Sequence, residues 1–91
     1  MSEAATASSS AAVNAILQPG QSATVFFGKE PATFKINLTG TIQRDAEMAV
    51  EVDGAVAETL TFTVRNITVN GRRITVNNVG RVAQGFVALQ A

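Results

Sequence analysis

The sequence predicts a small all-β fold: an antiparallel β-sandwich or barrel of six to seven strands with an extended N-terminal arm. Three observations predict this class. After residue 32, apolar and polar residues alternate with period two over most of the chain. Dipeptides that favour turns, namely Pro-Gly, Asp-Gly and Asn-Gly, separate the alternating stretches. With 91 residues and no cysteine, the chain has room for one domain that no disulfide framework holds together.

The N-terminal segment differs in composition from the rest. Residues 1–17 form an Ala/Ser-rich arm, and residues 18–91 form a single β-domain. Val13, Ile16 and Leu17 have i, i+3, i+4 spacing, which predicts at most one short helix before Pro19. So short a helix is marginal in water, so the arm needs a surface to lie on. That surface is either its own sheet or another chain.

Alternation after residue 32 predicts three consecutive strands that form a meander. They span residues 33–43, 47–53 and 59–65. A three-residue loop over 44–46 would pair Ile42 with Met48 and keep the apolar side chains on one face.

The connection between the second and third of these strands contains Asp53-Gly54, a usual signal of a two-residue turn. Such a turn would place charged side chains opposite apolar ones. We therefore predict a five-residue loop over 53–57, which pairs Val50 with Leu60.

A second hairpin signal, Asn-Gly at residues 70–71, agrees with the pattern around it. A type I′ turn there would pair Ile67 with Ile74. The apolar parity switches shortly before this turn, which predicts a β-bulge near residues 65–66 that bends the strand at a corner between two sheets.

Two further strands are expected at the ends of the domain. Residues 22–27 read as a short strand after the Pro19-Gly20 turn, and residues 82–89 read as the last strand. Gly85 lies inside the last strand, which indicates a bulge or a close backbone contact.

Two resemblances bear on the class of protein. The stretch LQPGQSATVFF, residues 17–27, resembles the opening of many immunoglobulin-like β-sandwich modules, where a Pro-Gly turn leads into an aromatic-bearing strand. The chain lacks the Cys…Trp…Cys spacing of antibody domains. Its general character, a short Cys-free β-domain with an Ala/Ser-rich arm, resembles small phage virion accessory proteins such as capsid decoration or cement proteins. That resemblance implies a structural role on a virion.

The residue inventory points away from catalysis. His, Cys, Tyr and Trp are absent and every serine lies in the first 22 residues, so no Ser/His or Cys/His nucleophile can form. Glu51 and Asp53, about 6.6 Å apart along a strand, are the residual candidates for acid/base hydrolysis of a sugar or for a calcium site. We expect no enzyme activity, no cofactor and no metal.

Charge and hydropathy limit the partners. Seven Lys/Arg balance seven Asp/Glu, and no aromatic residues are interleaved with the arginines, so nucleic acid is not an expected partner. No apolar run approaches the roughly 18 residues of a membrane span. The N-terminus lacks the features of a secretory signal, which predicts cytoplasmic synthesis.

These observations predict a non-enzymatic structural protein that forms homo-oligomers or cements a larger protein lattice, most specifically a virion accessory protein. The predicted contacts are the apolar arm residues Val13, Ile16 and Leu17, and Arg72 and Arg73 beside a hairpin tip.

The alternative is an immunoglobulin-like adhesion or carbohydrate-binding module. Its surface would be a threonine-rich outer face of the predicted meander. That face comprises Thr33, Thr39, Thr41, Thr59, Thr61 and Thr63.

Overall fold

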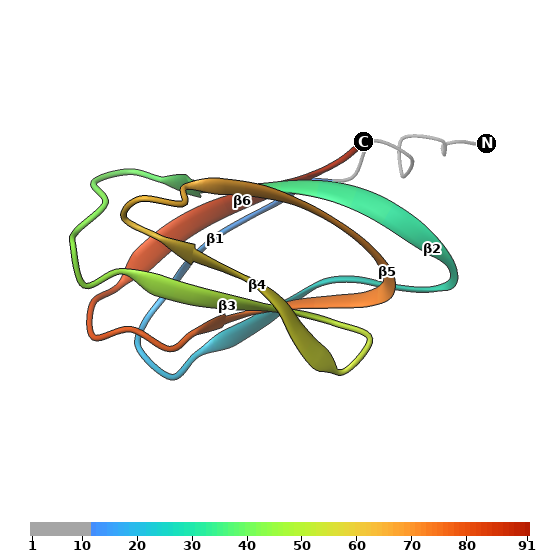
Figure 1. Cartoon of the computed structure of the whole chain (residues 1–91), viewed down its shortest axis with the longest axis horizontal. Coiled ribbons are helices and arrows are strands. Elements are labelled where there is room, and N and C mark those ends of the chain that lie inside the picture. The colour runs from blue at the N-terminus through green and yellow to red at the C-terminus, as the bar shows by residue number, and fades with distance from the viewer. Residues whose placement is uncertain (1–11) are drawn as a thin grey trace.

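The computed structural model describes residues 12–91, which form six strands and no helix (Figure 1). The strands are β1 (Ala12–Leu17), β2 (Ser22–Thr39), β3 (Glu47–Val52), β4 (Ala55–Thr61), β5 (Asn66–Asn78) and β6 (Gln84–Gln90). All neighbours are antiparallel, in the order β1-β6-β2-β5-β3-β4. The predicted all-β class is therefore confirmed. Residues 1–11 of the predicted arm lie outside the described residues.

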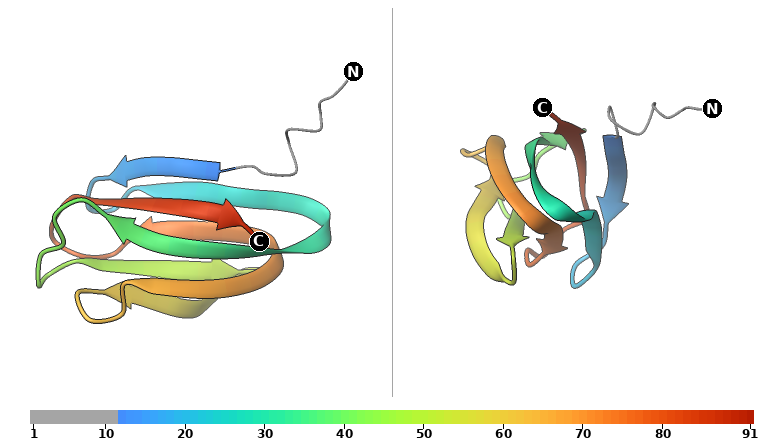
Figure 2. Two further views of the ribbon diagram at one scale, coloured as in Figure 1. Left: turned by 90° about the horizontal axis from the view of Figure 1, so that it is seen from above. Right: turned by 90° about the vertical axis from the view of Figure 1, so that its right-hand side faces the viewer.

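One sheet builds both layers of the fold because β2 and β5 are long and bend together. Their pairing has register shifts between Phe27 and Ala32, where the two strands turn from one layer into the other. Layer A consists of β1, β6, residues 32–39 of β2 and residues 66–71 of β5. Layer B consists of residues 22–27 of β2, residues 73–78 of β5, β3 and β4. Figure 2 shows the sheet curling around its interior, with β1 at one border.

The core lies between the two layers and receives buried side chains from every strand. Period-two alternation places these side chains on the inner face. The fully buried apolar residues are Phe34, Ile36, Met48, Val50, Leu60, Ile74, Val76, Phe86 and Ala88. Leu17 brings β1 into the same cluster. A core shared by all strands explains how so short a chain holds its sheet without disulfides.

The predicted Asn-Gly turn at residues 70–71 is wrong, because β5 runs through it as a strand. A Cβ added to Gly71 would lie 2.3 Å from Val52 Cγ1. Glycine is needed here to let β3 approach the bend of β5, and not to provide a positive φ. Ile67 consequently pairs with Ile36 on β2, not with Ile74.

The tight turn lies instead at Asp53-Gly54, so the predicted five-residue loop is also wrong. Both residues have positive φ, 53° and 94°, as a type I′ turn requires. A register shift follows Val50, so that Leu60 pairs with Met48 rather than with Val50. This bulge restores the apolar face that an unbroken two-residue hairpin would have lost.

The predicted meander is wrong as well. Strand β2 ends at Thr39, and residues 40–46 pass to layer B, where β3 pairs with β4 and β5. The expected pair of Ile42 and Met48 therefore does not form. Residues 62–65 connect β4 to β5 and return the chain to layer A. The expected corner near residues 65–66 thus exists, built by a loop and not by a bulge.

The last expected strand is confirmed, whereas the short strand expected over residues 22–27 is the first part of a longer strand of 18 residues. Residues 22–27 open β2, and β6 covers most of the range 82–89. The close contact expected at Gly85 is also present, since a Cβ there would lie 2.6 Å from Thr39 Oγ1.

The helix expected around Val13, Ile16 and Leu17 is wrong. Residues 12–17 form β1, which runs antiparallel to β6 in unbroken register. The inward row of this strand is Val13, Ala15 and Leu17, with period two. Small Ala15 completes the row, so the apolar spacing fits a strand once alanine is counted as apolar.

Candidate functional site

Strand β1 is an edge of layer A, and among residues 12–91 no strand pairs with its other side. Figure 2 shows it at the border of the sheet, with a neighbour on one side only. Every second residue of an antiparallel strand turns its N–H and C=O away from its partner. The sequence AVNAIL contains no charged residue and no proline. Within residues 12–91, this edge therefore offers backbone groups to another strand with no charge, proline or bulge of its own to protect it.

The outer face beside this edge is apolar. Ile16 is 71% exposed and lies opposite Gly85 of β6. Ala12 lies opposite Leu89, which is also exposed. Between these two pairs, Asn14 faces Val87. The outer side chains of β1 and β6 together form what we call the β1 edge face, defined by Ala12, Asn14, Ile16, Val87 and Leu89.

The C-terminal end of β1 is held from the inside by Asn78, which is 1% exposed. Asn78 Nδ2 donates hydrogen bonds to Leu17 O at 2.9 Å and to Val82 O at 2.8 Å. Its Oδ1 accepts one from Gly80 N–H at 2.9 Å. A single buried amide thus joins the ends of β1 and β5 to the loop before β6. Sequence reasoning missed it, although a polar residue in the inward row of β5 was a signal.

The hairpin at Asn70-Gly71 that Arg72 and Arg73 were expected to follow does not form, although both arginines lie beside the Asp53-Gly54 turn. They lie inside β5 where it bends, and their side chains are exposed. Their backbone N–H groups both donate to Asp53 Oδ1, at 2.9 and 3.0 Å. Because β6 and β2 separate β1 from β5, these arginines and the predicted arm residues do not form one site.

A second exposed feature lies at this bend. Phe27 is 77% exposed and is the register partner of Arg73. Aromatic residues and arginine are both enriched at protein contacts. We call Phe27, Arg72 and Arg73 the corner patch.

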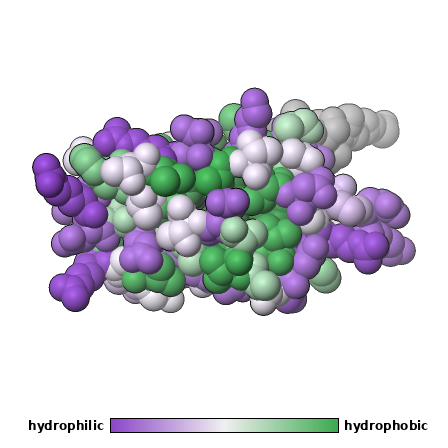
Figure 3. Space-filling view, in the orientation of Figure 1, coloured by the Kyte–Doolittle hydropathy of each residue, from purple (hydrophilic) through white to green (hydrophobic). Residues whose placement is uncertain are grey.

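Apolar exposure alone does not single out β1. Figure 3 shows apolar side chains gathered over the middle of another face, with hydrophilic side chains at both ends. The exposed large apolar residues of the described chain come from many elements. They are Ile16, Phe27, Val56, Val64, Val79 and Leu89. What distinguishes β1 is the combination of an apolar face with a regular, uncharged edge.

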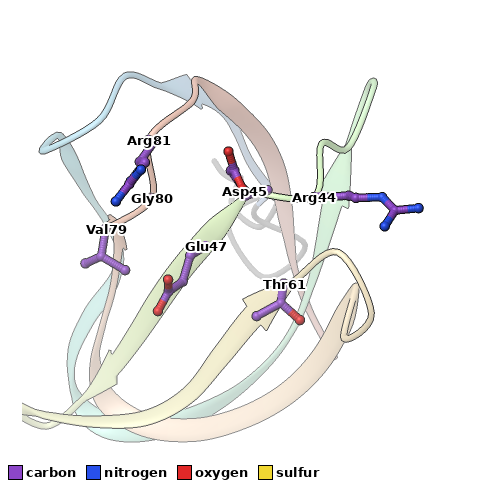
Figure 4. Close-up of a pocket in the computed structure, with 8 residues that line it drawn as sticks. Arg44, Asp45, Glu47, Thr61, Val79, Gly80 and Arg81 are labelled. Carbon is purple, nitrogen blue, oxygen red and sulfur yellow. The ribbon is translucent and has the colours of Figure 1, made fainter.

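An open pocket of about 300 Å³ lies where two loops, 40–46 and 79–83, meet the start of β3 and the end of β4 (Figure 4). Its lining residues are Arg44, Asp45, Ala46, Glu47, Thr61, Val79, Gly80 and Arg81. The two acidic residues balance the two arginines, and Figure 4 shows the Arg44 side chain directed away from the other lining residues. This arrangement concentrates neither charge nor acid/base groups on a ligand.

The remaining candidate groups are engaged in local structure or dispersed. Glu51 Oε2 accepts a hydrogen bond from Asn77 Nδ2 at 3.0 Å, and Asp53 closes the turn described above. Residues 12–91 contain no group of three or more His, Cys, Asp or Glu side chains that could hold a metal ion. The threonines divide between the layers, with Thr33 and Thr39 on β2 and Thr59 and Thr61 on β4. They therefore form no continuous array.

Comparison of the sequence with models of known protein families gives no match, and comparison with curated proteins gives no significant similarity. Residues 12–91 contain no helix long and apolar enough to cross a membrane.

Proposed function

We propose that this chain is a non-enzymatic structural protein that assembles through its β1 edge, on copies of itself or on a larger protein lattice. The observation that carries the proposal is that edge: six consecutive residues paired on one side only, without charge, proline or bulge. Proteins that act as monomers protect such edges, because an open edge pairs with other strands. Strand addition to a sheet edge is also a regular mode of protein recognition.

Within this class we propose a virion accessory protein of the decoration or cement type. A cementing protein joins neighbouring subunits and so needs more than one contact surface. The β1 edge face and the corner patch lie on different strands and provide two separate surfaces. The resemblance in size and composition to such proteins supports the same class.

The acidic residues support a non-enzymatic role. Glu51 and Asp53 each accept hydrogen bonds that support the fold, which gives both carboxylates a structural role. The inventory of the whole chain supplies no His or Cys to replace them.

Sedimentation of extracts from the cells or particles that naturally contain the protein tests this function. We expect the protein in fractions of particle mass, and we expect Ile16→Lys to move it to the fractions of the free chain. Val56→Lys is the matched control, because Val56 is an exposed apolar residue, 58% accessible, on the opposite edge strand β4. Recovery of the native protein only at the mass of the free chain would overturn the proposal.

A further inference from the structure

We infer that β1 pairs antiparallel with β1 of a second copy of this chain, about a two-fold axis that passes between the two Asn14 residues. The inference rests on the proposed function, because it names the partner of the same edge. A two-fold contact is closed and self-complementary, so one strand must satisfy its own copy.

Side-chain direction limits the registers. Directly opposed residues of an antiparallel pair point to the same face, so outward residues of one copy must oppose outward residues of the other. The outward row of β1 is Ala12, Asn14 and Ile16. Every register centred on a residue satisfies this condition, whereas a register centred between two residues places an inward residue against an outward one. Of the registers that satisfy it, those centred on residues 14 and 15 pair five residues of each β1, and the others pair three or fewer.

The end of β1 at Leu17 disfavours the register centred on residue 15. That register would use Leu17, whose carbonyl already accepts a hydrogen bond from Asn78. The next residue begins a turn in which Gln18 N–H donates to Gln21 Oε1 at 2.8 Å. It would also place apolar Ile16 against polar Asn14. The register centred on residue 13 uses only part of β1.

The register centred on Asn14 matches polar residues with polar ones and apolar residues with apolar ones. It brings the two Asn14 amides together at the axis, where each has a donor and an acceptor for the other. It sets Ile16 of one copy opposite Ala12 of the second copy. Since Ala12 lies beside Leu89, small Ala12 leaves room for Ile16 and Leu89 to approach across it. Because the contact is symmetric, Ile16 and Leu89 of each copy are covered in the same way.

Charge opposes such pairing at the other edge but not at this one. Strand β4 carries Glu58, and a two-fold contact there would bring like charges close to each other. Strand β1 carries no charge. Charge therefore favours β1 over β4 as the strand that pairs with a second copy.

Single-cysteine variants of the purified full chain test the register, because the chain has no cysteine of its own. Directly opposed Cβ atoms lie about 4.5–5.5 Å apart, close to the span of a disulfide. Under mild oxidation at high protein concentration, we expect Asn14→Cys to form a disulfide-linked dimer at least about ten times faster than Ala12→Cys. Two residues at position 12 would lie about 13 Å apart, because four residues of strand rise separate them.

A mixture of two variants provides a second test of the register. Ala12→Cys mixed with Ile16→Cys should give the mixed dimer, recognised by its mass, about as fast as Asn14→Cys links to itself. Val56→Cys on β4 is the control for random collision. If Asn14→Cys links no faster than Val56→Cys, or if Ala12→Cys alone links as fast as Asn14→Cys, the inference is wrong.

These outcomes are separate from those of the proposed function. Protein in particle fractions without Asn14→Cys linkage would overturn the self-pairing and leave the structural role in place. If Asn14→Cys links as predicted but the native protein is found only at the mass of the free chain, the self-pairing stands and the structural role on a larger assembly is wrong.

Discussion

Strands β1 and β4 are the two terminal strands in the order of the sheet, and they are built differently. Strand β4 carries Glu58, and a register shift interrupts its pairing with β3. Strand β1 has neither device and pairs with β6 without interruption. A charge and a bulge are the ordinary protections of an edge. The difference shows that one terminal strand of the sheet is protected and the other is open.

The largest expected effects concern the leucine that each edge strand contributes to the core. Leu60→Ala on β4 should lower the free energy of unfolding by about 3–5 kcal/mol, and Leu17→Ala on β1 by about 2–4 kcal/mol, because each leaves a cavity. Urea denaturation of both variants measures this. A Leu17→Ala cost below about 0.5 kcal/mol, typical of surface changes, would mean that β1 does not pack as described.

The next prediction concerns the amide that holds β1. Asn78→Ala should cost about 2–4 kcal/mol, because it leaves the carbonyls of Leu17 and Val82 and the N–H of Gly80 without their partner. Asn77→Ala is the control from the half-buried outer face, expected to cost about 1 kcal/mol or less. Equal losses in urea denaturation would contradict a special role of Asn78.

The turn that joins β4 to β3 should be less sensitive. Asp53→Ala removes the acceptor of two backbone N–H groups and places alanine at a φ of 53°, which together should cost about 1–3 kcal/mol. Asp53→Asn keeps an acceptor oxygen and tolerates this φ, so it should cost less than about 1 kcal/mol. Thermal unfolding compares the two, and the reverse ranking would contradict the assignment.

The smallest expected effect on stability comes from Glu58→Thr, which should instead change how strongly the protein associates with itself. Glu58→Thr removes the charge of the β4 edge and should change the free energy of unfolding by less than about 0.5 kcal/mol. We expect its mass by light scattering to rise with concentration more steeply than that of the parent chain. Glu47→Thr on β3 removes the same charge away from an edge, so equal association of both variants would show that net charge, and not edge protection, is responsible.

The alternation in the sequence predicted the class of fold and the positions of the end strands. It could not predict which strands pair, because several pairings place the same apolar residues inside. The two dipeptides show this. A regular hairpin at Asp53-Gly54 breaks the apolar face, so the sequence argues against this turn, but a bulge after Val50 restores the face. A turn at Asn70-Gly71 fits the local pattern, but Gly71 is needed for the close approach of Val52 from another strand.

The site was predicted in part. The sequence indicated that the segment around Val13 and Ile16 needs a surface, but the chosen period was helical. The true inward row depends on Ala15, whose single methyl group gives little periodic signal. The exposure of Phe27 could not be predicted, because it follows from the bend that β2 makes with β5.

The pairing of β1 with β6 has a consequence for the order of events at the ribosome. Ala12 is synthesised long before its partner Leu89. The backbone of β1 therefore has no β6 to pair with until almost the whole domain has been made. At about 5–20 residues per second, that delay lasts on the order of several seconds. During this time both sides of an uncharged strand are open to neighbouring nascent chains. Polysomes that crowd copies of this chain therefore bring β1 segments together before either domain is complete.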